Sequence, residues 1–312
     1  MGQAAFQLSA GALPNEIARE VFQSGAYTYR LIAESGEVRL SVRSGDQSFS
    51  RQVSWIFGAG VHGQTYLLQE EGNLYESQVS SFASTQGMDL TPGHTAAGEG
   101  TLENALGERL SSGSAAHCFS CHTTASSTES NFKPANAIPG VQCEACHGPG
   151  GDHVKTIMAD PSKRALSNTI FNPAHSKPGD VVDFCGACHR TSMDVVEEKD
   201  YGAINVRFQP YRLQKSRCWG PRGDSRITCI ACHDPHKPLV RDAGYYDGKC
   251  LACHSAGSAH FADRANATAA VCPKATANCT GCHMPKTDAP GMHAKFTDHF
   301  IRIVRAGEPY PN

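Results

Sequence analysis

The chain has 312 residues and a formal net charge of −2, so it is long enough for one large or two ordinary domains. This balanced charge gives no electrostatic basis for binding nucleic acid or an anionic membrane surface. No apolar run reaches the length of about 18 residues that a membrane-spanning helix needs. The unusual feature is the content of 14 Cys and 15 His. Their spacing must distinguish disulfides, metal sites and covalent haem.

The N-terminal region, residues 1–95, contains no cysteine. Five of its segments alternate apolar with polar side chains and favour β-branched or aromatic types, and turn formers such as ESGE, RSGD and EEGN separate them. The segments are AYTYRLI, EVRLSVR, QSFSRQVSWIF, QTYLLQ and NLYESQVS. The pattern predicts a small antiparallel sheet that covers the rest of the protein. His62 lies between two of the strands, either as a turn residue or as a metal ligand that the sheet supplies.

The C-terminal region, residues 100–312, repeats Cys-x-x-Cys-His six times. The copies are CFSCH, CEACH, CGACH, CIACH, CLACH and CTGCH, beginning at residues 118, 143, 185, 229, 250 and 279. The spacing between the copies is irregular. Each motif is therefore a separate local site, and the chain is not a solenoid of fixed repeat length.

The spacing within each motif matches the chemistry of covalent haem attachment. Two thiols three positions apart can add to the two vinyl groups of one porphyrin, and the following imidazole then lies under the iron. Zinc knuckles and redox Cys-x-x-Cys pairs have no need of the trailing histidine. The sequence therefore predicts six covalently attached c-type haems. The expected attachment thiols are Cys118, Cys121, Cys143, Cys146, Cys185, Cys188, Cys229, Cys232, Cys250, Cys253, Cys279 and Cys282. The expected proximal ligands are His122, His147, His189, His233, His254 and His283.

Around these motifs the sequence predicts short helices at residues 103–110, 152–160 and 180–190, with Pro- and Gly-rich loops elsewhere. Aliphatic residues are sparse for the length, so six buried macrocycles would supply the missing apolar surface. The expected fold class is α+β: a small N-terminal antiparallel β-sheet region followed by a loop-rich, short-helix multihaem domain.

Nine histidines lie outside the motifs, and six of them would be enough to give every haem a distal imidazole. His153 follows a Gly-Pro-Gly-Gly bend, which directs it away from its own motif towards a neighbouring one. His236 follows a shorter turn. His293 and His299 come after the last motif, where the chain can fold back. With His62 these are the expected distal ligands, and two further candidates are His117 and His260. We interpret His94 and His175 as histidines in loops.

The two cysteines outside the motifs are Cys218 and Cys272, and a disulfide between them is expected in an oxidising compartment. Haem attachment takes place on the export side of a membrane, which predicts a periplasmic or cell-surface protein. The first ten residues, MGQAAFQLSA, have neither the basic nor the apolar part of a signal peptide. We therefore expect either that the leader is missing from this sequence or that Met1 is not the natural start.

The segments GVQCEACHGPGGDHV, FCGACHR, CIACHDPH and CTGCHMPK resemble a superfamily of multihaem cytochromes. This superfamily is related to hydroxylamine oxidoreductase, pentahaem nitrite reductase and the tetrahaem cytochrome of ammonia oxidisers. The resemblance implies closely packed haem pairs, mostly bis-His ligation, and distal histidines that one segment provides to the haem of another. By position it supports His62, His153, His236, His293 and His299. The resemblance does not include a catalytic motif. The sequence has no motif for a lysine-ligated haem, and no tyrosine is placed like the cross-linking tyrosine of hydroxylamine oxidoreductase.

Three functions are compatible with these observations. The first is a carrier that passes single electrons along six haems between redox partner proteins. The second is a reductase or oxidase of small nitrogen or sulfur oxyanions at one five-coordinate haem. The third is a subunit of a haem-wire assembly, in an oligomer or a membrane-associated complex.

Overall fold

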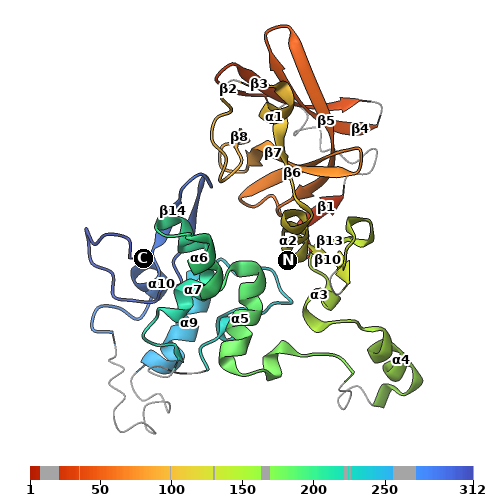
Figure 1. Ribbon diagram of the computed structural model, residues 1–312. Helices are drawn as coiled ribbons and strands as arrows, with labels where there is room; N and C mark the ends of the chain where they lie inside the picture. Colours follow the sequence, from red (N-terminus) through yellow and green to blue (C-terminus); the bar gives the residue numbers. More distant parts are fainter. Residues whose placement is uncertain are drawn as a thin grey trace. The chain divides into compact units, whose positions relative to one another are not determined.

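The computed structural model describes residues 1–7, 21–34, 36–98, 100–128, 131–162, 169–220, 224, 226–255 and 272–311 (Figure 1). The chain forms two compact units. The first is Met1–Asn172 with Pro290–Ala294, and the second is Pro173–Ala289 with Lys295–Asn312. The first two motifs thus lie in the unit that contains the sheet. The domain boundary expected at residues 95–100 stays a prediction.

The first unit is built on a nine-stranded antiparallel sheet of order β2-β3-β4-β5-β6-β7-β8, with β1 paired to β5 and β9 paired to β7. Its strands are β1 Ala5–Gln7, β2 Val21–Ser24, β3 Tyr27–Glu34, β4 Glu37–Ser44, β5 Gln47–Phe57, β6 Gly63–Glu70, β7 Asn73–Phe82, β8 Gly87–Leu90 and β9 Gly107–Arg109. The five segments expected from the alternating pattern are β3 to β7. In β4, for example, Val38, Leu40 and Val42 are buried while their neighbours are not. The expected α+β fold class is confirmed.

The sheet carries two clusters of buried apolar side chains. The first is built from β3 to β8 and closed by α1 (Leu102–Leu106), which contributes Ala105 and Leu106. The second gathers around Trp55, Phe57 and Phe119, whose rings meet edge to face at centroid distances of 5.0 and 5.1 Å. Phe119 lies on α2 (Ser112–His122), the helix that ends in the first motif. The sheet therefore packs directly against a predicted haem-binding helix.

The helix expected at residues 103–110 is shorter than expected, at five residues, because the chain changes to a strand at Gly107. Here the backbone passes so close to β7 that a Cβ would lie 2.3 Å from the Glu76 carbonyl oxygen. Only glycine permits this approach, and the next two residues pair with β7.

The other helices and strands are short, as expected. In the first unit they are β10 Thr123–Thr124, β11 Ser127–Thr128, β12 Asn131–Phe132, β13 Ile138–Pro139, α3 Cys143–His147, α4 Gly151–Ala159 and the 3₁₀ helix Pro134–Asn136. In the second they are α5 Pro178–His189, α6 Ser192–Glu198, α7 Gln209–Gln214, α8 Cys229–Cys232, α9 Ala243–His254, α10 Cys279–His283, β14 Lys286–Ala289 and the 3₁₀ helices Pro173–His175 and Ala203–Arg207. Strand β15, Ala294–Thr297, pairs with β14. The helices expected at 152–160 and 180–190 are α4 and α5. None of the described helices is both long and apolar enough to cross a membrane.

Candidate haem-binding sites

All six motifs lie on helical turns. Helices α2, α5 and α9 end with a motif, and α3 and α10 consist of one (Figure 1). Helix α8 spans the two cysteines of its motif. Because residues three apart share one face of a helix, both thiols of a motif are presented on the same side. This is the local geometry that a double thioether linkage requires.

Three motif histidines share one hydrogen-bonding pattern. Nδ1 of His122, His147 and His283 lies 2.8, 2.8 and 2.9 Å from a backbone carbonyl oxygen, supplied by Ala4, Phe171 and Arg302 respectively. A carbonyl oxygen can only accept, so Nδ1 must carry the proton. The lone pair is then on Nε2, and the ring orientation is fixed. This is the arrangement that metal-ligating histidines adopt in proteins.

The first motif is held by the sheet. The His122 ring stacks on Phe57 of β5 with centroids 4.7 Å apart and an angle of 4° between the planes. The Ala4 carbonyl that binds its Nδ1 immediately precedes β1, which pairs with β5. Strand β5 therefore orients this imidazole through its ring face, and the residue before β1 orients it through its Nδ1.

In the second unit the motifs are neighbours in chain order. Helix α5 contacts α8, α8 contacts α9, and α9 contacts α10. The first thiols of two successive motifs meet directly: a hydrogen bond from Cys229 lowers the pKa of the Cys185 thiol to about 7. Burial, with a contribution from nearby Cys279, raises the pKa of Cys250 to about 12. Four motifs thus form a continuous series of contacting helices in this unit.

His299, expected as a distal ligand, lies opposite the fourth motif. Its ring centroid is 6.1 Å from that of His233, and the ring planes are inclined by 40°. Nδ1 of His299 lies 3.0 Å from the Thr297 carbonyl oxygen. Nδ1 of His233 lies 3.4 Å from the hydroxyl of Tyr246, which donates to the Val240 carbonyl at 2.9 Å.

Both rings are neutral near pH 7. Burial lowers the pKa of His299 to about 4, and it also lowers the pKa of His233. Metal ligation requires the neutral imidazole, and both histidines meet this condition.

The other expected distal ligands lie in different surroundings. On α4, Nδ1 of His153 is 3.3 Å from the Thr169 hydroxyl. His236 is 75% exposed and faces Asp234 at 3.5 Å. His62 is exposed in the loop between β5 and β6, and His117 is exposed on α2. His260 lies outside the described residues. The ligand roles of these five histidines stay predictions.

His293 has another partner in the structure. Its Nε2 lies 2.8 Å from a carboxylate oxygen of Asp89, and its ring meets Phe82 at a centroid distance of 4.6 Å. Nε2 is the atom that would bind iron if Nδ1 followed the pattern of the motif histidines. The ligand role of His293 stays a prediction, and it would require the bond to Asp89 to break.

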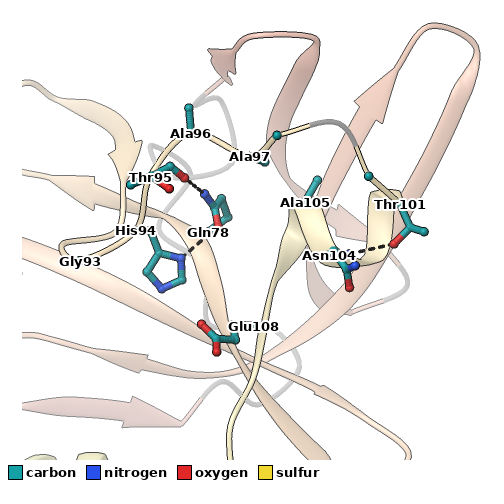
Figure 2. Close-up of a pocket in the computed structure, with 12 residues that line it drawn as sticks. Gln78, Gly93, His94, Thr95, Ala96, Ala97, Thr101, Asn104, Ala105 and Glu108 are labelled. Atoms are coloured by element: carbon teal, nitrogen blue, oxygen red, sulfur yellow. Dashed lines mark hydrogen bonds between the residues drawn. The ribbon is translucent and has the colours of Figure 1, made fainter.

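The two loop histidines differ in their surroundings. His175 is exposed in a 3₁₀ helix. His94 lines a cavity of about 390 Å³ next to the sheet (Figure 2). Its Nδ1 lies 3.0 Å from the Gln78 side-chain oxygen and its Nε2 lies 3.1 Å from a Glu76 carboxylate oxygen. Both ring nitrogens are engaged, so His94 ties its loop to β7. This role of His94 could not be predicted from the sequence, because its partners precede it by 16 and 18 residues.

The cysteines outside the motifs have different environments. Cys218 is half-buried, and burial raises its pKa, with further contributions from Cys232 and Cys253. Backbone hydrogen bonds with Ala275 and Lys274 lower the pKa of Cys272. The two sulfurs are not bonded to each other in the structure. The Cys218–Cys272 disulfide stays a prediction.

The residues fit covalent haem in a further respect. Nε of Arg302 is buried and has no hydrogen-bond partner among the described residues, although its Nη1 binds Asp298 and Phe300. A buried guanidinium donor normally has an acceptor. A haem propionate is an acceptor of the right charge, and the Arg302 carbonyl already binds the sixth motif histidine.

Comparisons with known proteins agree with this chemistry. Residues 76–148, from β7 through the second motif, match the family described as cytochrome c554 and c-prime. The chain is 25% identical over 220 residues to the multihaem cytochrome MtrA of Shewanella baltica (strain OS185). The motifs and both matches support a multihaem c-type cytochrome. The match covers 56% of this chain and 62% of MtrA, so the chain spans less than two thirds of its relative. No solved structure matches the chain. Neither match names hydroxylamine oxidoreductase or nitrite reductase, so these relationships stay predictions.

Proposed function

We propose that the protein is a periplasmic or cell-surface hexahaem cytochrome that carries single electrons between redox partner proteins. The observation that carries this proposal is the repeated site: six Cys-x-x-Cys-His turns, with Nδ1 of three motif histidines bound to a backbone carbonyl. The series of contacts from α5 to α10 supports a continuous path in the second unit.

Bound haem supplies the one-electron chemistry, because its iron alternates between the ferric and ferrous states. The residues of the chain hold and tune it. Each pair of motif cysteines anchors one macrocycle, and each motif histidine provides a proximal imidazole. The carbonyls of Ala4, Phe171 and Arg302 fix three of these rings and increase their electron donation.

His233 and His299 are the two residues that would together hold the iron of the fourth haem. Each imidazole would then have to come within about 2 Å of that iron. The two rings are separated by 6.1 Å, and the Nδ1 atom of each is occupied by an oxygen partner. The half-buried His299 thus has the tautomer and charge of a distal ligand.

A direct test replaces His299 with Ala. The oxidised wild type is expected to contain six covalent haems by mass spectrometry and to show low-spin signals in its electron paramagnetic resonance spectrum. The variant should keep six haems while one low-spin signal is replaced by a high-spin signal. His94→Gln is the matched control, because that histidine binds β7, and it should leave every signal unchanged. Fewer than six haems in the wild type would contradict the proposal.

The contact of His293 with Asp89 favours one alternative, a reductase or oxidase of small nitrogen or sulfur oxyanions. If His293 keeps this partner, one iron can lack a distal imidazole and bind a substrate. A high-spin haem in the oxidised wild type would support this enzyme and contradict a purely low-spin carrier.

A further inference from the structure

The second unit contains a fully buried ion pair that the haem motifs do not account for. Arg212 and Asp298 are both 0% exposed, and the guanidinium binds the carboxylate through two bonds of 2.8 Å. Arg302 adds a third bond to the same carboxylate at 2.6 Å. Burying these charges is costly unless their geometry is good and their remaining atoms are satisfied. A role that needs a rigid carboxylate would explain why they are retained.

The remaining atoms are indeed largely satisfied. Arg212 also donates to the Pro311 carbonyl at 2.7 Å and to the Asn205 side chain at 3.3 Å, and Asn205 accepts from the Tyr310 hydroxyl at 2.7 Å. Burial alone would raise the pKa of Asp298, but the hydrogen bonds from Arg212 and from the Phe300 amide more than offset this effect and lower it.

In the sequence, Asp298 lies between His283 and His299, the two residues proposed to bind haem iron. Asp298 immediately precedes His299 and accepts from the Phe300 amide at 3.0 Å. The hydroxyl of Ser216 holds the same segment, because it donates to the His299 carbonyl at 3.1 Å and accepts from the Ile301 amide at 2.8 Å. The position of the His299 backbone is thus fixed from both sides.

The second imidazole is that of the sixth motif. The Arg302 carbonyl accepts from Nδ1 of His283 at 2.9 Å, and the Arg302 amide donates to the His283 carbonyl at 3.2 Å. The side chain of Arg302 is held by Asp298. The carboxylate that stabilises the segment carrying His299 therefore also places the residue that orients His283.

We propose that Asp298 is a positioning residue shared by two haem sites, those of His299 and His283. This inference rests on the proposed haem ligation. Without the carboxylate, the segment from Thr297 to Arg302 would lose its anchor, and both imidazoles would change orientation. Loss of a buried negative charge also favours the ferrous state, so the reduction potential of the nearby haems should rise.

The test compares Asp298→Asn with Asp288→Asn. Asp288 lies in the same unit and its substitution removes the same charge, but its side chain is 76% exposed and meets only Lys295, at 3.7 Å, in the contacts of the described residues. Each full-length variant is analysed by mass spectrometry, paramagnetic resonance and potentiometric titration. His299→Ala identifies the signal of the haem that His299 ligates.

Asp298→Asn is expected to retain six haems. It should shift or broaden two low-spin signals, one of which is the signal lost in His299→Ala. It should also raise the reduction potentials of two haems. The control should match the wild type. Signals and potentials of Asp298→Asn that equal those of Asp288→Asn would overturn the inference while leaving the haem ligation intact. A His299→Ala spectrum identical to the wild type would instead contradict the ligation itself, and the shared role with it.

A second variant covers the case in which Asp298→Asn yields no protein with six haems. Arg302→Gln leaves the Arg212–Asp298 pair in place and removes the bonds that the Arg302 guanidinium makes to Asp298 and to the Phe300 carbonyl. It should alter the signal of the sixth haem more than that of the His299 haem. Unchanged signals in this variant would overturn the inference.

Discussion

The hydrogen-bond partner of Nδ1 differs among the motif histidines. Backbone carbonyls accept from His122, His147 and His283, but His233 faces the hydroxyl of Tyr246. A phenol oxygen is a weaker acceptor than a peptide carbonyl, so His233 should donate less electron density to its iron. Individual haems of similar ligation can therefore differ in potential because of this one contact.

We predict that Tyr246→Phe raises the potential of one haem. The substitution removes the acceptor of the His233 Nδ1 proton, which makes the imidazole a poorer donor and favours ferrous iron. Potentiometric titration should show one component moving to a more positive potential. Tyr245→Phe is the control, because the Tyr245 ring packs against Tyr246 without a bond to His233 among the contacts of the described residues. Identical titrations of the two variants would contradict the prediction.

Because Tyr29 is buried, we predict that the free energy of unfolding of the sheet falls at alkaline pH. Burial, assisted by neighbouring Tyr27, raises the pKa of Tyr29 to about 12, compared with about 10 in an unfolded chain. The folded state therefore holds this proton more tightly. The stabilisation is fully present below about pH 10 and is lost as the pH rises towards 12.

This loss of stability can be measured by urea unfolding of the wild type and of Tyr29→Phe, together with amide exchange of β3 and β4. The variant loses the hydroxyl bond to the Ala105 carbonyl, so it should be less stable near pH 7. The difference between the two proteins should shrink between pH 10 and 12. A difference that is constant with pH would show that Tyr29 does not titrate in this range.

At the scale of elements, one motif helix is capped by its neighbour. Helix α10 has five residues, too few to be stable alone, and Asp247 of α9 accepts from the amides of Asn278 and Cys279 at 2.8 Å each. These bonds lower the pKa of Asp247. The fifth motif helix thus orders the start of the sixth.

We predict that Asp247→Ala loosens the sixth motif. Loss of a capping side chain costs about 1 kcal/mol, so the Asn278 and Cys279 amides should exchange roughly fivefold faster. Asp180→Ala, which changes an exposed acidic residue in the first turn of α5, is the control and should leave both amides unchanged. Equal exchange rates in the two variants would contradict the prediction.

The strands and motif helices show how much of the fold could be predicted from the sequence. Strands β3 to β7 are long enough for alternation to be visible, whereas β1 and β9 have three residues each and are formed through pairing with β5 and β7. The six motifs are local and could be read directly. The partners of His122 could not, because Phe57 and Ala4 are brought to it by folding. His299 could be named as a ligand, but its pairing with His233 depends on tertiary structure.

At the scale of the whole molecule, the two units differ in what stabilises them. Both identified clusters of buried apolar side chains lie in the first unit, on the sheet and α2. The described part of the second unit buries only a few aliphatic and aromatic side chains, such as Val182, Val206 and Phe208. Four of the six motifs lie in this second unit, so its missing core is expected to be haem.

We predict that the units respond differently when haem is withheld. In protein produced without haem attachment, β3 to β7 should keep slow amide exchange, since their core is complete without cofactor. Helices α5 to α10 should exchange near the rate of an unfolded chain. Hydrogen exchange with mass spectrometry of the two forms makes the comparison. Equal protection of both units in the haem-free protein would contradict the prediction.

The carbonyl bonds to the motif histidines have a consequence for the speed of electron transfer. When an electron arrives at a metal, its ligands and surroundings must rearrange, and the energy of that rearrangement limits the rate. A ring that is stacked on Phe57 and bonded to the Ala4 carbonyl has little freedom to move. If His122 binds a haem iron, we expect this restraint to lower the ligand's share of the rearrangement energy and so to speed electron transfer at that site.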